Sequence, residues 1–213
     1  KLNYVFKGAP VIMRYSVNGA KWCDGELSRH SRFQDVHCFE FNGHVDSLEF
    51  VFKHTDGSWG NPDPAKGNQF LQRNPEGIYN YHVKGSGEFL IYQGKIAEVH
   101  QEKMKEKFMV ITDLDGTLVG RLDGIIAWNE YFIWNIMLNP NFKVAYSTGR
   151  GIELYMKLYH ETPLLMPEIL VLGCGTEIYH WDSTKQGLTV DYEYMETFSH
   201  EWDQPTIMAE IDK

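Results

Sequence analysis

The sequence has little cysteine, no long hydrophobic run and no dense cluster of basic residues. Its 213 residues include only three cysteines, at positions 23, 38 and 174, which are too few and too scattered for a disulfide scaffold or a zinc site. A reducing compartment is the simpler interpretation, although Cys23 and Cys38 could still pair. No apolar run approaches the roughly 18 residues of a membrane-spanning helix, and nothing near Lys1 resembles a signal peptide.

Charge is distributed unevenly along the chain. Residues 1–107 carry 14 Lys and Arg against 13 Asp and Glu, whereas residues 108–213 carry 6 against 16. This asymmetry indicates two units joined near residue 100. Neither unit has a basic stripe dense enough to bind nucleic acid. Residues 95–107 are charged and contain good helix formers, so we expect a first domain at 1–94, a helical linker at 95–107 and a second domain at 108–213.

The first half consists of short β-rich segments separated by turn signals. Residues 10–17 run into Asn18-Gly19, a dipeptide typical of tight hairpins. Further strands are expected at the ranges 36–41, 47–53, 77–83 and 88–92. Strands at this spacing, without a helical period, predict an all-β sandwich of immunoglobulin-like type.

Two tryptophans of this half, Trp22 and Trp59, stand next to turns. The stretch 57–64 around Trp59 is too rich in Gly and Pro to be expected as a strand. A loop tryptophan can pack over its own domain, which composition alone favours. Alternatively, its indole can stack on the apolar face of a sugar ring while Asn, Asp and Gln bond the hydroxyls.

Motifs across residues 4–92 resemble starch-binding modules of the twenty-five and fifty-three type. In chain order the motifs are Met13-Arg-Tyr-Ser-Val-Asn-Gly-Ala-Lys-Trp22, Leu48-Glu-Phe-Val-Phe52, Asp56-Gly-Ser-Trp-Gly-Asn61, Gly67-Asn68 and Gly77-Ile-Tyr79. The resemblance implies a β-sandwich that binds starch or another α-glucan through Trp22 and Trp59, with Asn61 and Asn68 in the following loop. The family's histidine falls on Arg14, whose guanidinium can also stack and donate. Trp-Gly-Asn in place of Trp-Asp-Asn is a second departure. Starch would imply an intracellular setting, in the cytosol or a plastid.

The pattern changes to α/β after the linker. Residues 108–112 form a short apolar run, as expected for a buried parallel strand. A helix at 122–138, a strand at 142–147, a helix at 151–160 and a strand at 169–172 are expected to follow. This alternation predicts a doubly wound parallel sheet.

Polar residues follow the first two of these strands, where open α/β sheets place their ligands. Asp113 and Asp115 are spaced so that both carboxylates leave the strand end on the same side. One could attack phosphorus while the other handles protons, and a divalent cation could offset their charge. The Thr148 hydroxyl and the Gly149 amide, at a helix start, could hold a phosphate oxygen. An acid pair that merely caps the next helix is the alternative, but the Thr-Gly-Arg after the second strand favours catalysis.

These motifs resemble the haloacid-dehalogenase superfamily, and in particular its sucrose-phosphate phosphatase branch. The resemblance runs from about residue 108 to 203 and is carried by Asp113-Leu-Asp-Gly-Thr-Leu-Val-Gly120, Val144-Ala-Tyr-Ser-Thr-Gly-Arg150 and Leu172-Gly-Cys-Gly-Thr-Glu-Ile-Tyr179. It implies a magnesium-dependent phosphatase in which Asp113 is the nucleophile and Asp115 the general acid and base. Both residues would bind Mg²⁺, Asp115 through its backbone carbonyl. Thr148 would bind the transferring phosphoryl group, and residues 173–177 would line the substrate side.

Two motifs of that superfamily are missing. After Arg150 the only lysines are Lys157, Lys185 and Lys213, and no Gly-Asp-type acidic motif follows. The resemblance therefore implies an incomplete α/β core without its cap and C-terminal motifs, and we expect a piece of a longer polypeptide. Its first strand would then be an unpaired apolar edge, which proteins rarely leave bare. The expected partners are an α-glucan and a sugar phosphate, not nucleic acid or a membrane. The alternative is a starch-binding regulatory protein whose phosphatase-like half does not turn over.

Overall fold

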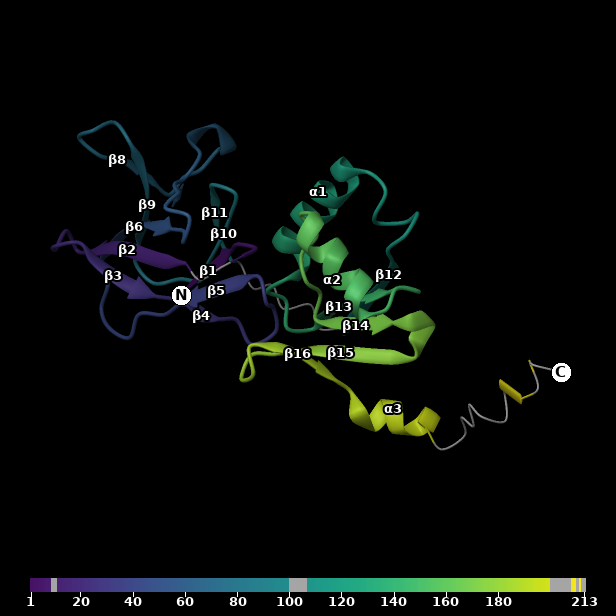
Figure 1. Ribbon diagram of the computed structural model, residues 1–213. Coiled ribbons are helices and arrows are strands. Elements are labelled where there is room, and N and C mark those ends of the chain that lie inside the picture. The colour runs from purple at the N-terminus through teal and green to yellow at the C-terminus, as the bar shows by residue number, and fades with distance from the viewer. Residues whose placement is uncertain (9–10, 100–106, 200–207, 210, 212–213) are drawn as a thin grey trace.

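The structure, a computed structural model, describes every residue of the chain except 9–10, 100–106, 200–207, 210 and 212–213 (Figure 1). Two β-sheets form the first half, and a third sheet with helices forms the second half. No helix within the described residues is long and apolar enough to cross a membrane.

The first sheet has the strand order β11-β10-β1-β5-β4. Its strands are β1 (Leu2–Val5), β4 (Ser28–Arg29), β5 (Val36–Phe39), β10 (Phe89–Tyr92) and β11 (Lys95–Glu98). Strand β1 pairs in parallel with β10 and antiparallel with β5.

The helix predicted over 95–107 is wrong for its first four residues, because these form β11. Gln93 and Gly94 both have positive φ, at 44° and 81°, the combination that makes a tight two-residue hairpin turn. The chain therefore returns antiparallel onto β10, with Tyr92 opposite Lys95. Residues 100–106 of the expected linker lie outside the described residues.

The second sheet has the strand order β3-β2-β6-β9-β8, and β7 also pairs with β6. Its strands are β2 (Ile12–Val17), β3 (Cys23–Glu26), β6 (Ser47–Lys53), β7 (Trp59–Gly60), β8 (Leu71–Arg73) and β9 (Tyr79–Lys84). The predicted Asn18-Gly19 turn is confirmed, with φ of 51° and 74° and a bond of 2.9 Å from the Ala20 amide to the Val17 carbonyl. The expectation of no strand around Trp59 is wrong for β7, which ends before Pro62 removes an amide donor.

The first sheet is buried on both of its faces. Alternate residues of a strand point to opposite faces, and here Leu2 and Tyr4 join a core shared with the second sheet, whereas Val5 joins a core shared with the second half of the chain. Strand β10 divides in the same way, with Leu90 and Tyr92 on the side of Val5. A strand covered on both faces needs apolar residues throughout, which explains the continuous Phe-Leu-Ile-Tyr run of β10.

The second half is built on a sheet with the strand order β12-β13-β14-β15-β16. The chain runs through β12 (Phe108–Asp113), α1 (Leu122–Tyr131), a π-helical turn η2 (Phe132–Ile136), β13 (Phe142–Ser147), α2 (Ile152–Glu161), β14 (Ile169–Leu172), a 3-10 turn η3 (Gly173–Gly175), β15 (Glu177–Asp182), β16 (Gly187–Val190) and α3 (Tyr192–Ser199). The predicted alternation of three strands and two helices is confirmed. Strands β12, β13 and β14 are parallel, but β15 and β16 are antiparallel additions that sequence analysis missed.

Two features of this sheet differ from the predicted doubly wound arrangement. Helices α1 and α2 both contribute to a single core on one face of the sheet, which also takes Val144 and Tyr146 of β13. Strand β12 is parallel and is an edge strand with β13 as its only partner among the described residues, both as expected, but it is therefore exposed rather than buried. Met109 and Ile111, on its open face, are 49% and 62% exposed.

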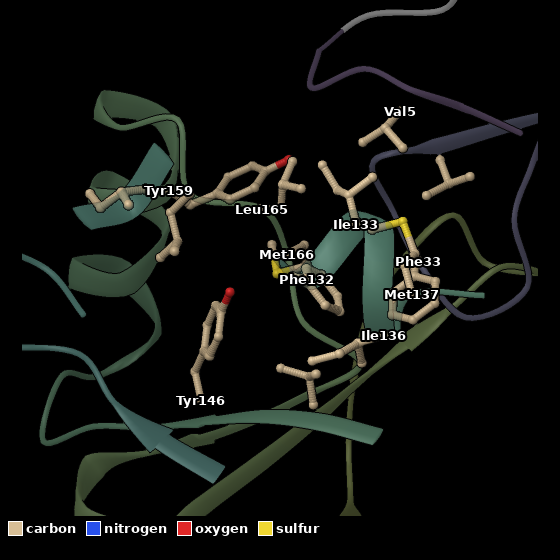
Figure 2. Close-up of a cluster of buried hydrophobic side chains, with 14 of the residues drawn as sticks. Val5, Phe33, Phe132, Ile133, Ile136, Met137, Tyr146, Tyr159, Leu165 and Met166 are labelled. Atoms are coloured by element: carbon tan, nitrogen blue, oxygen red, sulfur yellow. The ribbon is translucent and has the colours of Figure 1, made fainter. Parts of the chain in front are cut away.

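The two halves share one hydrophobic core. Val5 and Phe33 from the first half pack beside Ile133 and Met137, which follow α1 (Figure 2). The Phe33 ring meets the Phe132 ring edge-on, with centroids 5.6 Å apart. The two predicted units are therefore packed together through buried apolar side chains, which a simple tether between independent domains would not produce.

Buried polar contacts reinforce this junction. Asp35 accepts hydrogen bonds from the Tyr159 hydroxyl at 2.5 Å and from the Met166 amide at 2.8 Å. Arg32 forms a two-pronged ion pair with Glu168 at 3.1 and 2.9 Å. Lys7 donates to three carbonyls at the end of α2 and just beyond it, those of residues 159, 162 and 164. The segment after α2 is thus held by the first half of the chain.

Candidate functional site

The loop after β12 presents Asp113 and Asp115 at the carboxyl end of the sheet. Asp113 is the last residue of β12 and lies opposite Ser147, the last residue of β13. The loop turns around the fully buried Leu114, whose carbonyl accepts from the amides of residues 117, 118 and 119. Gly116 adopts φ of 76°, a left-handed conformation that favours glycine. Both carboxylates are therefore exposed, that of Asp113 at the end of β12 and that of Asp115 on a loop with a fixed shape.

Arg150 joins this loop to the one after β13. Its guanidinium donates to both carboxylate oxygens of Asp115, at 2.8 Å from Nε and 2.6 Å from Nη2. This pair, more than the hydrogen bond from Thr148, holds the pKa of Asp115 below its usual range. The contact brings the two predicted motifs together. Arg150 was not among the predicted site residues. Its place in the Thr-Gly-Arg motif is the signal in the sequence that could have identified it.

Thr148 is 4% exposed and fixed by its backbone. Its amide donates to the Val171 carbonyl on β14, and its own carbonyl accepts from the Cys174 amide. The Thr148 hydroxyl accepts from the Arg150 amide at 3.2 Å. Gly149 lies two residues before Gly151, the N-cap of α2. A phosphate oxygen at this point would meet a hydroxyl and the positive end of a ten-residue helix.

The turn at residues 173–177 lies beside the same edge. Cys174 has φ of 57°. Its Sγ lies 3.4 Å from where a Cβ on residue 149 would be, so it would contact any side chain added at Gly149. The Tyr194 hydroxyl of α3 donates to the Gly175 carbonyl at 2.7 Å. Helix α3 therefore supports this turn from outside, a role that sequence analysis did not anticipate.

Asp113 and Asp115 supply hard oxygen ligands of the kind that Mg²⁺ prefers, and Mg²⁺ commonly uses one or two carboxylates together with water and substrate phosphate. Within the described residues no third His, Cys, Asp or Glu joins them in a group. Both Asp115 oxygens are already bonded to Arg150, so the Asp113 carboxylate and the Asp115 backbone carbonyl are the fitting donors. The residues present fit part of a magnesium site.

The sugar-binding residues predicted for the first half do not all line one pocket. Trp22 lines a pocket of about 330 Å³ together with Glu49, Gln72, Arg73, Asn74, Pro75, Glu76 and Asn80. Asn80 donates to Glu49 at 2.7 Å, which fixes the carboxylate in the pocket wall. One indole among amide, carboxylate and guanidinium groups is a composition suited to a sugar ring. Of the predicted residues, only Trp22 lines this pocket.

Trp59, Arg14 and Asn61 do not line this pocket, although Arg14 and Trp59 lie on the same face of the second sheet as Glu49 of its lining. Trp59 is 46% exposed on β7, and Lys53 lies 5.8 Å above its ring. Arg14 is exposed in β2, between Val51 of β6 and Asp24 of β3 in the register. Asn61 directly follows β7.

Asn68 has a structural role that the sequence did not reveal. Its amide group donates to the carbonyls of Asp63 and Gly94 at 2.6 and 2.9 Å, and its side-chain oxygen accepts from the Ile96 amide at 2.8 Å. The side chain therefore ties the loop after β7 to β11.

Comparisons with known proteins place the second half in a family. Residues 106–213 match the profile of "Sucrose-6F-phosphate phosphohydrolase". Probable sucrose-phosphatase 2 of Arabidopsis thaliana is 30% identical over 108 residues, which are 49% of this chain and 24% of that protein. This chain thus spans about a quarter of the length of that relative.

Two solved structures are also similar. The sucrose-phosphatase from Synechocystis, in complex with sucrose and phosphate, is 27% identical and matches 50% of this chain and 40% of its own, with a TM-score of 0.43. A CBM25 from a Bacillus halodurans amylase, in complex with maltotetraose, is 18% identical and matches 47% of this chain and 96% of its own, with a TM-score of 0.33. Because the profile match alone covers half of the chain, the chain belongs to the sucrose-6F-phosphate phosphohydrolase family.

Proposed function

We propose that this chain carries the nucleophile and phosphate-binding half of a magnesium-dependent sugar-phosphate phosphatase of haloacid-dehalogenase type. One observation carries the proposal: Asp113 and Ser147 lie opposite each other at the ends of the paired strands β12 and β13, so that Asp113, Asp115 and Thr148 occupy one sheet edge. Membership of the family makes sucrose 6-phosphate the first substrate to test.

In the proposed reaction, an Asp113 oxygen attacks phosphorus and the bond from phosphorus to the sugar oxygen breaks. Asp115 gives its proton to that leaving oxygen. Asp115 then takes a proton from water, which attacks the aspartyl-phosphate and releases inorganic phosphate. Thr148 and the start of α2 orient the phosphoryl oxygens. When bound, Mg²⁺ would be held by the Asp113 carboxylate and the Asp115 carbonyl and would offset negative charge on the phosphoryl group.

The pair with Arg150 opposes one step of this scheme. It keeps Asp115 charged, with a lowered pKa, whereas a general acid must carry a proton. A substrate phosphoryl group could compete for the guanidinium and release the carboxylate, since Arg binds phosphate oxygens well. If the pair does not open, the chain is a regulatory protein without turnover, and this contact is the observation that favours that second function.

For the first half, we propose a β-sandwich of starch-binding type that holds α-glucan against Trp22. The pocket beside Trp22 supports this, because it combines a half-buried indole with polar groups, of which Asn80 and Glu49 fix each other. Trp59, Asn61 and Arg14 remain candidates for contacts with further sugar rings. Asn68 would act indirectly, by holding the loop that follows Trp59.

The phosphatase proposal is tested by phosphate release from sucrose 6-phosphate with and without Mg²⁺. We expect slow, magnesium-dependent release, because Lys157 and Lys185 pair with Glu161 and Asp182 instead of facing Thr148. Missing electrostatic partners of this kind commonly cost about 10²–10³ in rate each. Asp113→Asn should abolish release, and Thr148→Ala should slow it.

Asp123→Asn is the matched control for the assay. Asp123 is an exposed acid in the first turn of α1 that pairs with Arg121, so its removal should leave the rate unchanged. If release is absent, or survives Asp113→Asn, the enzymatic function fails and the regulatory function takes its place.

Glucan binding is tested separately by retardation of the chain on native gels that contain soluble starch. Trp22→Ala should reduce retardation, with a loss of about 1–3 kcal/mol in binding free energy. Trp181→Phe, in the other half, should leave retardation unchanged. Unchanged migration of Trp22→Ala would contradict the proposed pocket.

A further inference from the structure

A second pocket, of about 470 Å³, lies where the two halves of the chain meet. It is lined by Leu27, Ser28, Arg29, His37, Ser183, Thr184 and Gln186. The first four come from β4, β5 and the residue before β4, and the last three come from the turn between β15 and β16. Its volume is within the range typical of small-molecule sites.

Both walls of this pocket are fixed in place. Arg29 and His37 are directly opposite in the antiparallel pair β4–β5, so their side chains lie on the same face. On the other wall, Asp182 accepts from the amides of Thr184 and Lys185 at 2.8 and 3.2 Å, which shapes the turn. The Trp181 indole donates to the His30 carbonyl at 3.2 Å and joins one wall to the other.

Arg29 is a cation that the fold leaves partly unsatisfied. A guanidinium has five donors. Nη1 donates to the Gln34 carbonyl and lies 2.9 Å from His37 Nε2, and Nη2 donates to the Gly8 carbonyl. One donor on Nε and one on Nη2 therefore have no partner among the described residues. Asp35 lies close enough to interact electrostatically with Arg29, but its two oxygens bond elsewhere.

The other groups of the lining are neutral donors and acceptors. His37 is 1% exposed, and burial together with Arg29 lowers its pKa to about 4, so it is uncharged at neutral pH. The Ser183 hydroxyl makes no hydrogen bond within the part of the chain that the structure describes, whereas the Thr184 hydroxyl bonds the Asp182 carboxylate. No carboxylate lines the pocket, so the lining carries a single positive charge.

We propose that this pocket binds a phosphate-class oxyanion, either free or as part of a small phosphorylated sugar. The two free donors of Arg29 would meet two oxygens of the anion, and the Ser183 hydroxyl would bond a remaining oxygen or a hydroxyl of a sugar. The remaining volume exceeds the needs of phosphate alone. This site uses none of the residues of the phosphatase proposal and does not depend on that activity.

The test is an NMR titration of the ¹⁵N-labelled chain. EDTA is present so that no turnover occurs. The probes are inorganic phosphate, glucose 6-phosphate and neutral sucrose. The indole signal of Trp181 reports on this pocket, and that of Trp128, which donates to Tyr146 in the second half, is the internal control. We expect Trp181 to shift with both phosphate compounds and not with sucrose. Tighter binding of glucose 6-phosphate would identify a sugar phosphate, and equal binding would identify the free anion.

Variants locate the binding. Ser183→Ala, which removes a hydroxyl without a partner among the described residues, should weaken binding about threefold, and Arg29→Gln about tenfold or more. Lys185→Gln removes a cation from the same turn without touching the lining, and Thr148→Ala alters the other candidate phosphate site; both should leave the Trp181 response unchanged. A Trp181 signal that does not move, moves equally with sucrose, or is weakened as much by Lys185→Gln would overturn the proposal.

Discussion

The junction between the two halves and the β12 edge are opposite in character. At the junction, Phe33 is 1% exposed and Asp35 is 2% exposed with both carboxylate oxygens bonded. At the edge, Ile111 is 62% exposed and Asp113 ends the strand in the open. Residues that stabilise the fold and residues proposed to do chemistry are thus separated. Variants at the junction should therefore change the stability of the fold without changing the proposed chemistry, and variants at the β12 edge should leave the stability unchanged.

The largest effect is expected for Phe33→Ala. Removal of a fully buried aromatic ring costs about 3–5 kcal/mol, and this ring lies in the core common to both halves. The free energy of unfolding, measured with urea, should fall by that amount. The fluorescence of Trp22 in the first half and of Trp128 in the second should change at one denaturant midpoint. Two separate midpoints would show that the halves are independent folding units.

A smaller effect is expected for Arg32→Ala. The Arg32 guanidinium bonds Glu168 and the carbonyls of Asn139 and Phe142, and both side chains of the ion pair are mostly buried. Its loss leaves a buried carboxylate without a partner, which should lower the free energy of unfolding by about 2–3 kcal/mol. Arg121→Ala is the control, since its pair with Asp123 is exposed and should contribute under about 0.5 kcal/mol. Equal losses of stability in the two variants would contradict the difference between the buried and the exposed ion pair.

Local signals in the sequence sufficed for many elements of the fold. The Asn18-Gly19 turn, strand β6 and the strands β12, β13 and β14 follow from period, turn residues and apolar runs. Strand β11 could not be found in this way, because Lys95–Glu98 reads as a charged helix and only the positive φ of Gln93 and Gly94 returns it to β10. The continuous apolar run of β10 was the signal for a sheet covered on both faces, but what covers it is encoded far away in the chain.

In the candidate sites, too, local signals do not predict contacts between segments that are distant in the chain. The position of Asp113 and Asp115 after an apolar strand was enough to predict a shared sheet edge with Thr148. The hydrogen bonds of Arg150 to Asp115 depend on the distance between two loops and could not be derived from spacing. The pocket beside Trp22 is completed by residues from β6, β8 and β9 and the turn between the latter two, which pair only in the folded sheet.

The third prediction concerns pH at the junction. Burial raises the pKa of Asp35 above its ordinary value of 3.8 in spite of two hydrogen bonds. Its protonated form is thus favoured by folding, and the associated stability is fully present below pH 3.8 and lost as pH rises through the raised pKa. The stability advantage of the native protein over Asp35→Asn should therefore be larger near pH 4 than at pH 7.

Urea unfolding at several pH values measures this advantage. Asp123→Asn provides a comparison of opposite sign, because Arg121 lowers the pKa of Asp123, and any stability from that carboxylate is present above pH 3.8 and lost as pH falls. An Asp35 advantage that grows with pH would show that the Tyr159 and Met166 donors outweigh burial.

The smallest effect is expected at the β12 edge, for Ile111→Thr. Ile111 faces solvent on an edge strand, and threonine keeps the branched shape that suits a strand, so the free energy of unfolding should change by less than about 0.5 kcal/mol. Val144→Thr on the neighbouring strand β13 is the matched control, because Val144 is 1% exposed within the shared core. There the replacement by threonine places a hydroxyl among apolar side chains and should cost about 1–3 kcal/mol. If Ile111→Thr costs as much as Val144→Thr, the open face of β12 is covered in solution, and the contrast between the edge and the junction does not hold.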